Sequence, residues 1–194
     1  MSSLSTVRTL FVEQIEAAAG ITHATGNRQE ALTFALDLAA SRTPGLCLLD
    51  GMPLQKALAA PGMEAEDLAF LQAGAHERGV TLITEDLRDH LGGISVSVFT
   101  TPLGIAETGT CIQADAREDV RLAGMLAEAQ VIILSESHIV PGPTEAAPLI
   151  DKFMAEGPVY LSCISGPSRT ADIERVRALG VHGPLELHVV VVGE

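Results

Sequence analysis

The 194-residue sequence has little cysteine, little positive charge and no long hydrophobic run, and each shortage excludes a class of protein. Its three cysteines, Cys47, Cys111 and Cys163, stand far apart, whereas zinc knuckles and iron–sulfur clusters need closely spaced thiolates. We therefore expect three separate buried thiols and no cofactor held by this chain itself. The six histidines show no HExxH-like spacing, so we also expect no metal site.

The charge balance argues against nucleic acids and membranes as partners. Twelve Lys and Arg stand against 25 Asp and Glu, which gives a formal net charge of −13. Non-specific binding to nucleic acid needs clustered basic residues, and this sequence has no such cluster. No apolar run reaches the roughly 20 residues that span a bilayer, and the first ten residues lack the apolar core of a signal peptide. We therefore expect a cytoplasmic protein.

The residues that are plentiful predict an ordered α/β domain. Hydrophobic residues make up 47% of the chain, which is enough for a substantial core. Apolar residues at helical spacing alternate along the chain with short apolar runs that are typical of strands. The expected helices cover 4–18, 28–40, 64–78, 117–129, 144–156 and 168–179. The expected strands cover 46–49, 80–83, 94–99, 131–134, 159–163 and 185–192.

This alternation predicts an α/β fold with a mostly parallel central sheet and flanking helices. The strands read as unbroken apolar runs, and such runs fit a sheet that is buried on both faces. We expect one domain over residues 1–194, made of a helical N-terminal segment over 1–43 and an α/β core over 44–194.

The run from Ser165 to Glu174 combines glycine, hydroxyl groups and an arginine where a strand is expected to pass into a helix. Backbone N–H groups at a helix start favour an anion, and a guanidinium adds a planar, charge-assisted fork to it. The alternative is that a hydroxyl of this run only caps the helix. Both readings remain open. The candidate ligand-binding residues here are Ser165, Gly166, Ser168, Arg169 and Thr170.

Two further loops follow predicted strands, and we expect them to meet this run. They are Thr100 to Thr110 and Ser135 to His138. Ligands of open α/β sheets bind outside the carboxyl ends of the strands. We therefore expect the three polar loops to converge on one edge of the sheet.

The Thr100 to Thr110 loop supplies the first candidate catalytic residue, Glu107. Its carboxylate can act as a base, a nucleophile or a ligand-orienting acceptor, or it can accept backbone hydrogen bonds that fix the loop. The second candidate is His182, which can serve as an acid or base or simply donate to a carbonyl. His188 alternates with apolar residues and is expected to be a packed or edge residue. Further candidate ligand-binding residues in the loop are Gly104, Thr108, Gly109 and Thr110.

The run from Ser165 to Glu174, followed by Gly180-Val181-His182-Gly183-Pro184 and a β-rich end, resembles the LUD-domain family. The segment Ala106-Glu107-Thr108-Gly109-Thr110 is similar to the central loop of that family. The resemblance is strong over residues 80–194. Within the family, the chain looks most like the small, single-domain lactate utilisation protein C type.

The resemblance implies a NagB/RpiA/CoA-transferase-like fold and a role in oxidising L-lactate to pyruvate together with iron–sulfur-containing partner subunits. This chain would bind a small anion, with Arg169 pairing it, Ser168 and Thr170 donating to it, and Glu107 orienting it or moving protons. Two alternatives stay open. One is an independent acyl- or phosphoryl-transfer enzyme with Glu107 as nucleophile, and the other is a non-catalytic, ligand-binding regulatory module.

Overall fold

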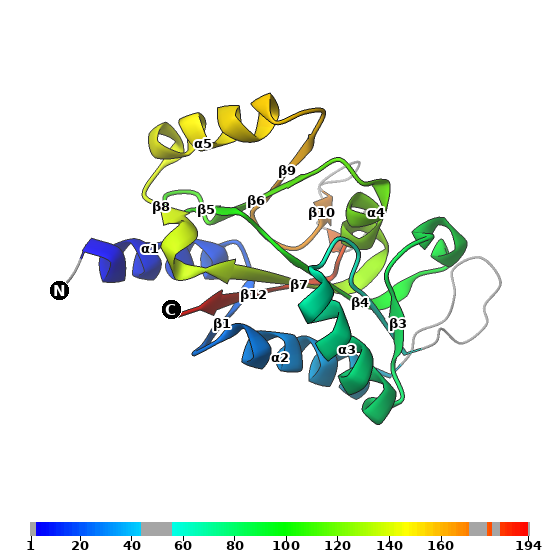
Figure 1. Ribbon diagram of the computed structural model, residues 1–194. Helices are drawn as coiled ribbons and strands as arrows, with labels where there is room; N and C mark the ends of the chain where they lie inside the picture. Colours follow the sequence, from blue (N-terminus) through cyan, green and yellow to red (C-terminus); the bar gives the residue numbers. More distant parts are fainter. Residues whose placement is uncertain (1–2, 44–55, 171–177, 180–182, 194) are drawn as a thin grey trace.

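A computed structural model describes residues 3–43, 56–170, 178–179 and 183–193 of the protein (Figure 1). At its centre is a six-stranded sheet. Its strands are β1 (Ile21–Thr25), β2 (Ala57–Ala59), β3 (Thr81–Ile83), β4 (Ile94–Thr100), β7 (Ala127–Ser135) and β12 (Glu186–Val192). Their order is β1-β12-β7-β4-β2-β3, and every neighbouring pair is parallel. The predicted α/β fold with a mostly parallel central sheet is thereby confirmed.

Helices cover both faces of this sheet (Figure 1). One face carries α2 (Arg28–Ser41) and α3 (Ala65–Arg78), and the other carries α1 (Ser3–Ala17) and α4 (Glu118–Leu126). Asn27 caps α2, because its side chain accepts a hydrogen bond from the backbone N–H of Glu30 at 2.9 Å. Apolar residues of α2 at helical spacing are buried against the sheet, namely Ala31, Leu32, Ala35, Leu36 and Ala39. Two 3-10 turns complete the connections, η1 (Leu87–His90) and η2 (Glu136–His138).

A second, four-stranded sheet lies on the α1 and α4 side of the first (Figure 1). It consists of β5 (Leu103–Ile105), β6 (Thr110–Asp115), β8 (Ile139–Val140) and β9 (Tyr160–Ile164), in the order β8-β5-β6-β9. Helix α5 (Pro143–Ala155) packs on it through Ala146, which is fully buried. The strand expected over 159–163 corresponds to β9, but β5 and β8 have only three and two residues and show no side-chain alternation in the sequence, so the second sheet was not predicted.

Two predicted helices need correction. The helix expected over 117–129 ends at Leu126, and β7 begins at the next residue. The helix expected over 168–179 is wrong at both described ends, where β10 (Arg169–Thr170) pairs antiparallel with β11 (Ala178–Leu179). The backbone N–H of Ser168 donates to the carbonyl of Pro184 at 2.9 Å, which ties this turn to the chain entering β12 rather than to a helix start.

Of the other strands, two predicted ones are confirmed, one was missed and one cannot be compared. The strand expected over 46–49 lies outside the described residues. Strand β1 was missed because two threonines and a histidine leave it without an apolar run. The strands expected near 94–99 and 185–192 are the buried centre of the molecule, where side chains such as Val98 and Val189 are fully buried. Burial of a valine of this kind stabilises the fold by roughly 1.5–3 kcal/mol. No helix among the described residues is both long and apolar enough to cross a membrane.

Candidate functional site

The three predicted loops do not meet on one edge of the parallel sheet. Thr100 and Ser135 end neighbouring strands at the carboxyl edge, as expected. The Ser165 to Thr170 run instead follows β9, which belongs to the second sheet. The side chain of Arg169 reaches the carbonyl of Ala18 at 2.6 Å, close to the start of β1, and Figure 1 shows β10 at the end of the sheet away from the C terminus. The expected convergence of all three loops on the carboxyl edge is therefore wrong, because β9 pairs with β6 and not with the parallel strands. Only the end of the first loop meets the run, where Thr110 contacts Ser165.

This run borders a cavity of about 450 Å³. The walls come from α4, β6 and β9, and the floor comes from β4 and β7. The exposed side chains of Met125 and Tyr160, at 59% and 52%, mark where it opens to solvent. Its volume lies within the range that small-molecule sites occupy in proteins. Six of the residues that line it, apart from those of the predicted run, are Phe99, Gln113, Arg121, Met125, Gln130 and Tyr160.

Two buried glutamines that line this cavity each carry an unpaired amide atom that is closed off from solvent. Gln113 on β6 is 9% exposed and Gln130 on β7 is 2% exposed. Within the described parts of the chain, the carbonyl oxygen Oε1 of Gln113 and the amide nitrogen Nε2 of Gln130 have no hydrogen-bond partner. Leaving a buried donor or acceptor unsatisfied costs about 1–3 kcal/mol, so each such atom calls for a specific explanation.

The charged groups around the cavity favour an anion. The guanidinium of Arg121 lies 4.7 Å from the ring centroid of Tyr160, and Arg169 lines the same cavity. Asp115 also lines it, but its carboxylate is held by the side chain and the backbone N–H of Arg117. Burial raises the pKa of Asp115, and these hydrogen bonds outweigh that effect and leave the pKa below its usual value. In a chain of net charge −13, two arginines gathered at one cavity make it locally attractive to anions.

Four of the predicted ligand-binding residues come together here, namely Ser165, Gly166, Ser168 and Arg169. The hydroxyl groups of Thr108, Thr110 and Ser165 form a hydrogen-bonded series that joins this run to the loop before β6. Thr108 and Thr110 are 2.7 Å apart between their Oγ1 atoms, and Thr110 lies 2.7 Å from the Oγ of Ser165. Gly166 has a φ of +141°, and a Cβ there would lie 2.7 Å from the carbonyl oxygen of Ala18. Only glycine fits that position without displacing the end of α1.

Three of the other predicted site residues lie away from the cavity, namely Gly104, Glu107 and Gly109. Glu107 is exposed, is not among the residues that line the cavity, and donates its backbone N–H to the carbonyl of Pro141 at 3.0 Å. Gly104 and Gly109 serve packing, because a Cβ on either would lie 2.7 Å from Leu134 or from the α1 backbone. His182 lies outside the described residues, and the side chain of Thr170 is not described.

Sequence reasoning missed the glutamines, although one of them left a visible sign. Gln130 is the only amide in the otherwise apolar stretch from Ala129 to Leu134, and a polar residue in a strand buried on both faces needs a partner. Gln113 gave no comparable sign, because no helix or strand was predicted over residues 111–116, which include most of β6.

Of the two described cysteines, Cys111 is buried as expected and Cys163 is not. Burial raises the pKa of the Cys111 thiol to about 12, which fits an inert core residue. Cys163 is exposed rather than buried, because β9 is an edge strand of the second sheet. Cys47 lies outside the described residues. In the described ranges, no three His, Cys, Asp or Glu side chains are placed so that they could hold a metal ion.

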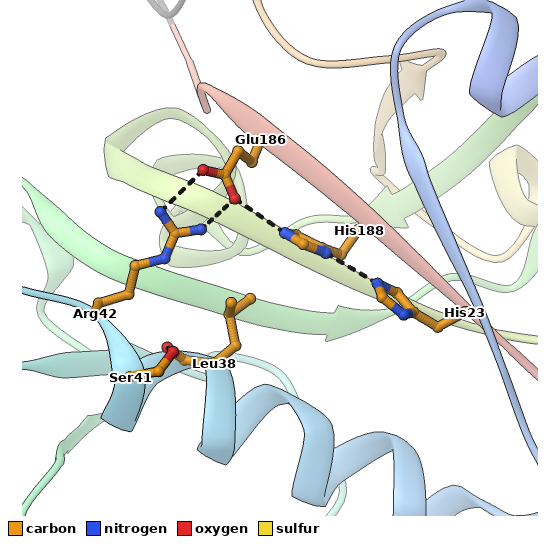
Figure 2. Close-up of polar contacts among 6 residues, drawn as sticks. All are labelled: His23, Leu38, Ser41, Arg42, Glu186 and His188. Carbon is orange, nitrogen blue, oxygen red and sulfur yellow. Dashed lines mark hydrogen bonds and ion pairs between the residues drawn. The ribbon is translucent and has the colours of Figure 1, made fainter.

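A second polar cluster lies on the other face of the parallel sheet, between the strands and α2 (Figure 2). Arg42 forms a two-pronged ion pair with Glu186, whose Oε2 lies 3.2 Å from the Nε2 of His188. The Nδ1 of His188 in turn lies 3.0 Å from the Nε2 of His23 on β1. The ring of Phe34 closes the cluster, with its centroid 4.1 Å from that of His23.

The histidines of this cluster favour the neutral form. Burial is the main cause that lowers the pKa of both rings, and repulsion from His188 lowers the pKa of His23 further. For His188, the attraction of Glu186 opposes the effect of burial without cancelling it. The prediction that His188 is a packed residue is confirmed, since only 6% of it is exposed.

Comparison with known proteins places these observations in context. A family model for the LUD domain matches residues 8–192. The "Lactate utilization protein C" of Bacillus licheniformis is 35% identical over 101 residues, which cover 50% of this chain and 42% of that protein. The protein of the same name from Bacillus subtilis is 32% identical over 103 residues, or 52% of this chain and 43% of that protein. The matched segment thus spans less than half the length of these curated relatives.

A solved structure gives a comparison over the whole chain. The crystal structure of a DUF162 family protein from Deinococcus radiodurans has a TM-score of 0.64 and 20% sequence identity, and the match covers 100% of both chains. At that level of identity the likeness bears on the fold alone.

Proposed function

Because the chain belongs to the LUD-domain family, we propose that it serves lactate utilisation, as a subunit of a multi-protein complex that oxidises L-lactate to pyruvate. The observation that carries this proposal is the similarity of half the chain to proteins named lactate utilization protein C in several bacteria. Because fold alone never establishes function, this similarity of sequence weighs more than the shared architecture.

The reaction itself indicates why partners are needed. Oxidation of L-lactate to pyruvate removes two electrons and two protons from the substrate, so an electron acceptor must be within reach. The widely spaced cysteines of this chain do not match an iron–sulfur binding pattern. We assign the electron-carrying step to iron–sulfur clusters in partner subunits, and ligand binding to this chain.

The cavity beside Ser165 to Arg169 is the proposed binding site, and its ligand carries a carboxylate or phosphate. The guanidinium of Arg169 offers five N–H donors, and its one hydrogen bond among the described residues goes to Ala18. The remaining donors suit an oxyanion, and the hydroxyls of Ser165 and Ser168 line the same cavity. An acyl-transfer reaction through Glu107 gains no support from this arrangement, because that residue does not line the cavity.

Deletion of the gene in the organism that carries it tests the proposed pathway. We expect the deletion strain to lose growth on L-lactate as sole carbon source and to grow normally on pyruvate, because only the oxidation step is missing. Normal growth on L-lactate would overturn the proposal. A defect on both carbon sources would overturn it as well, since the role would then lie outside lactate oxidation.

Complementation of that strain tests the site. We expect Arg169→Ala to restore growth on L-lactate poorly, since it removes the proposed anion partner. Arg88→Ala is the matched control, because Arg88 is an exposed arginine on η1 that does not line the cavity. Equal rescue by the two variants would show that the anion is not bound by Arg169.

A further inference from the structure

A second cavity, of about 500 Å³, lies at the carboxyl edge of the parallel sheet. Its lining includes residues that directly follow β2 and β4, which are neighbours in the sheet. From β2 the chain passes into α3 on one face, whereas from β4 it passes to the second sheet and α4 on the other face (Figure 1). Two adjacent strands whose connections diverge in this way form a topological switch point, the place where open α/β sheets bind ligands.

Segments that follow or end five different strands contribute to this carboxyl-edge cavity. Arg28 follows β1, Glu64 follows β2, Thr101 follows β4, Arg117 follows β6 and Ser135 ends β7. The segments after β4 and at the end of β7 are two of the loops that the sequence led us to expect at this edge. The two cavities share only Gln113 and Asp115 in their linings, so the carboxyl-edge cavity is distinct from the one beside the Ser165 run.

Two arginines line this cavity, and a carboxylate holds each of them in place. Nε and Nη2 of Arg28 donate to the carboxylate of Asp67, which is only 6% exposed. Nε and Nη2 of Arg117 donate to Asp115, and Nη2 also donates to the carbonyl of Gly62 at 3.3 Å. Among the described residues, Nη1 of neither arginine has a hydrogen-bond partner. Each guanidinium is therefore already positioned and keeps donors for a ligand.

The turn after β2 is shaped to accept one of these guanidinium groups. Gly62 has a φ of +76°, a conformation that favours glycine. A Cβ at this position would also lie 2.6 Å from Nη2 of Arg117. The glycine thus lets the guanidinium of Arg117 lie directly against the backbone at the edge of the cavity.

The carboxylate of Glu64 gives the same cavity a hydrogen-bond acceptor. Glu64 is exposed, and its side chain neither caps α3 nor has a hydrogen-bond partner among the described residues. Hydrogen bonds with Asp67 and Asp115 are the main causes that raise the pKa values of Arg28 and Arg117, and the charge of Glu64 raises both further. Glu64 therefore lies near both guanidinium groups without being bonded to either.

These groups restrict the chemistry of a ligand. Guanidinium donors suit the oxygens of a carboxylate or phosphate, whereas the carboxylate of Glu64 needs a donor such as a hydroxyl group. A ligand that carries only negative charge would be repelled by Glu64. No Phe, Tyr or Trp is among the described residues that line this cavity, so it offers no surface on which a base or ring would stack. A small, polar ligand with both an oxyanion and a hydroxyl group fits best.

We propose that the carboxyl-edge cavity is a second ligand site and that it binds a small hydroxylated oxyanion, that is, a hydroxy acid or the phosphate ester of a polyol. The carboxylate or phosphate lies at Arg28 and Arg117, and the hydroxyl group donates to Glu64. This site goes beyond the proposed function, which places a ligand only beside the Ser165 run. L-lactate belongs to this class of ligand, so the experiment has to tell the two cavities apart.

Isothermal titration calorimetry of the purified chain with L-lactate and with glycerol 3-phosphate tests the proposal. Propionate is the matched control ligand for L-lactate, because it lacks only the hydroxyl group. We expect at least one of the two hydroxylated anions to bind with a sub-millimolar Kd. If L-lactate binds, propionate should bind at least about tenfold more weakly, since a hydrogen bond to a charged group is lost.

Substitution of Glu64 tests the acceptor. Glu64→Ala should weaken binding of the hydroxylated anion about tenfold and leave binding of propionate unchanged or stronger, because it removes the acceptor together with a repelling charge. Glu13→Ala is the control, at an exposed glutamate of α1 that does not line the cavity. It should bind as the unaltered chain does.

Substitution of Arg117 tests the oxyanion contact. Arg117→Ala should weaken binding of every anion at this site about tenfold or more. Arg88→Ala is the matched control, because Arg88 is likewise held by a carboxylate through Nε and Nη2 but does not line the cavity. Urea unfolding verifies that Arg117→Ala is folded. Arg117→Lys keeps the charge beside Asp115 and loses the planar fork, so it should bind more tightly than Arg117→Ala and more weakly than the unaltered chain.

The proposal is overturned if neither hydroxylated anion binds at millimolar concentration, or if the folded Glu64 and Arg117 variants bind as the unaltered chain does. Binding that is lost in Arg169→Ala and kept in Arg117→Ala would also overturn it, since the ligand would then occupy the cavity beside the Ser165 run. That outcome would leave the proposed role in lactate utilisation intact. Binding that depends on Glu64 and Arg117, in a chain whose deletion strain grows normally on L-lactate, would support the second site and overturn the pathway instead.

Discussion

Two polar clusters lie on opposite faces of the parallel sheet, at the neighbouring strands β12 and β7, and they differ in whether their buried polar atoms have partners. On the α2 face, His188 of β12 has Glu186 on one ring nitrogen and His23 on the other. On the α4 face, the neighbouring strand β7 carries Gln130, whose Nε2 has no partner among the described residues. Both side chains are more than nine-tenths buried, so exposure does not explain the difference.

The contrast separates polar groups that stabilise the fold from polar groups that cost it stability. A buried group whose partners are in place fixes one arrangement of the strands and stabilises it. A buried group without a partner costs free energy because it has given up its hydrogen bond to water. The histidine cluster therefore stabilises the fold, and the unpaired amide atoms of the glutamines cost it stability. Four experiments test this division, and the largest effect is expected from the histidine side.

Replacing His188 by leucine should destabilise the protein by about 2 kcal/mol. The substitution keeps an apolar side chain in the core but leaves His23 and Glu186 each without one hydrogen-bond partner, and bonds to charged groups contribute about 1.5–3 kcal/mol. The free energy of unfolding in urea at pH 8 measures the loss. A loss below about 0.5 kcal/mol would show that the cluster is not structural.

Replacing Gln130 by leucine should change the free energy of unfolding by less than about 1 kcal/mol, and stabilisation is the expected direction. Leucine fills a similar volume and removes a donor that has no partner in the described part of the chain. The same urea titration, without added ligand, provides the comparison with His188→Leu. A loss as large as that of the histidine variant would mean that Gln130 is a structural residue, and the two faces would not differ.

The stability of the protein should fall as the pH falls below about 6.5. The pKa values of His23 and His188 lie below their ordinary value of 6.5 in the folded chain, so the unfolded chain binds more protons as the solution becomes acidic. The stabilisation is complete above pH 6.5 and is lost as the pH falls through the folded pKa values. The pKa of Glu186, lowered from 4.5 chiefly by the hydrogen bond from Arg42, adds a loss of the same sign at lower pH.

Partial exposure of His23 limits the size of this effect to about 1 kcal/mol or less. Unfolding free energies measured at pH 8, 7, 6 and 5 give the slope. His23→Gln should flatten it, whereas Gln130→Leu should leave it unchanged. A slope that survives in His23→Gln and also in His188→Leu would place the acid sensitivity outside the cluster.

The sequence predicted the architecture better than the site for a physical reason. Helical and strand periodicities are local, so the central strands and most helices could be read from runs such as 28–40 and 185–192. The pairing of strands that are far apart in the sequence is not a local property. Nothing near β9 indicates that it pairs with β6, and that one pairing moved the Ser165 run from the carboxyl edge to the opposite end of the sheet.

The site residues illustrate the same limit. The run of Ser165, Gly166, Ser168 and Arg169 was identified from local chemistry, and all four line one cavity. The reason offered for it, a helix start, was wrong, because Arg169 begins a strand. Glu107 was a candidate catalytic residue, yet it is exposed on a turn and does not line the cavity. Gln113 and Gln130 line the same cavity through tertiary packing, which no spacing in the sequence encodes.

The smallest effect on stability is expected from Arg169→Ala, on the cavity side. Arg169 is exposed and makes one described hydrogen bond, to the carbonyl of Ala18, so its loss should cost about 0.5 kcal/mol or less. Binding of an anionic ligand should weaken by about 1–3 kcal/mol in the same variant, because a hydrogen bond to a charged group is lost. Urea titration and calorimetry on one preparation measure both quantities. A loss of stability larger than the loss of binding would make Arg169 a structural clamp on the end of α1, and the cavity side would then resemble the histidine cluster rather than differ from it.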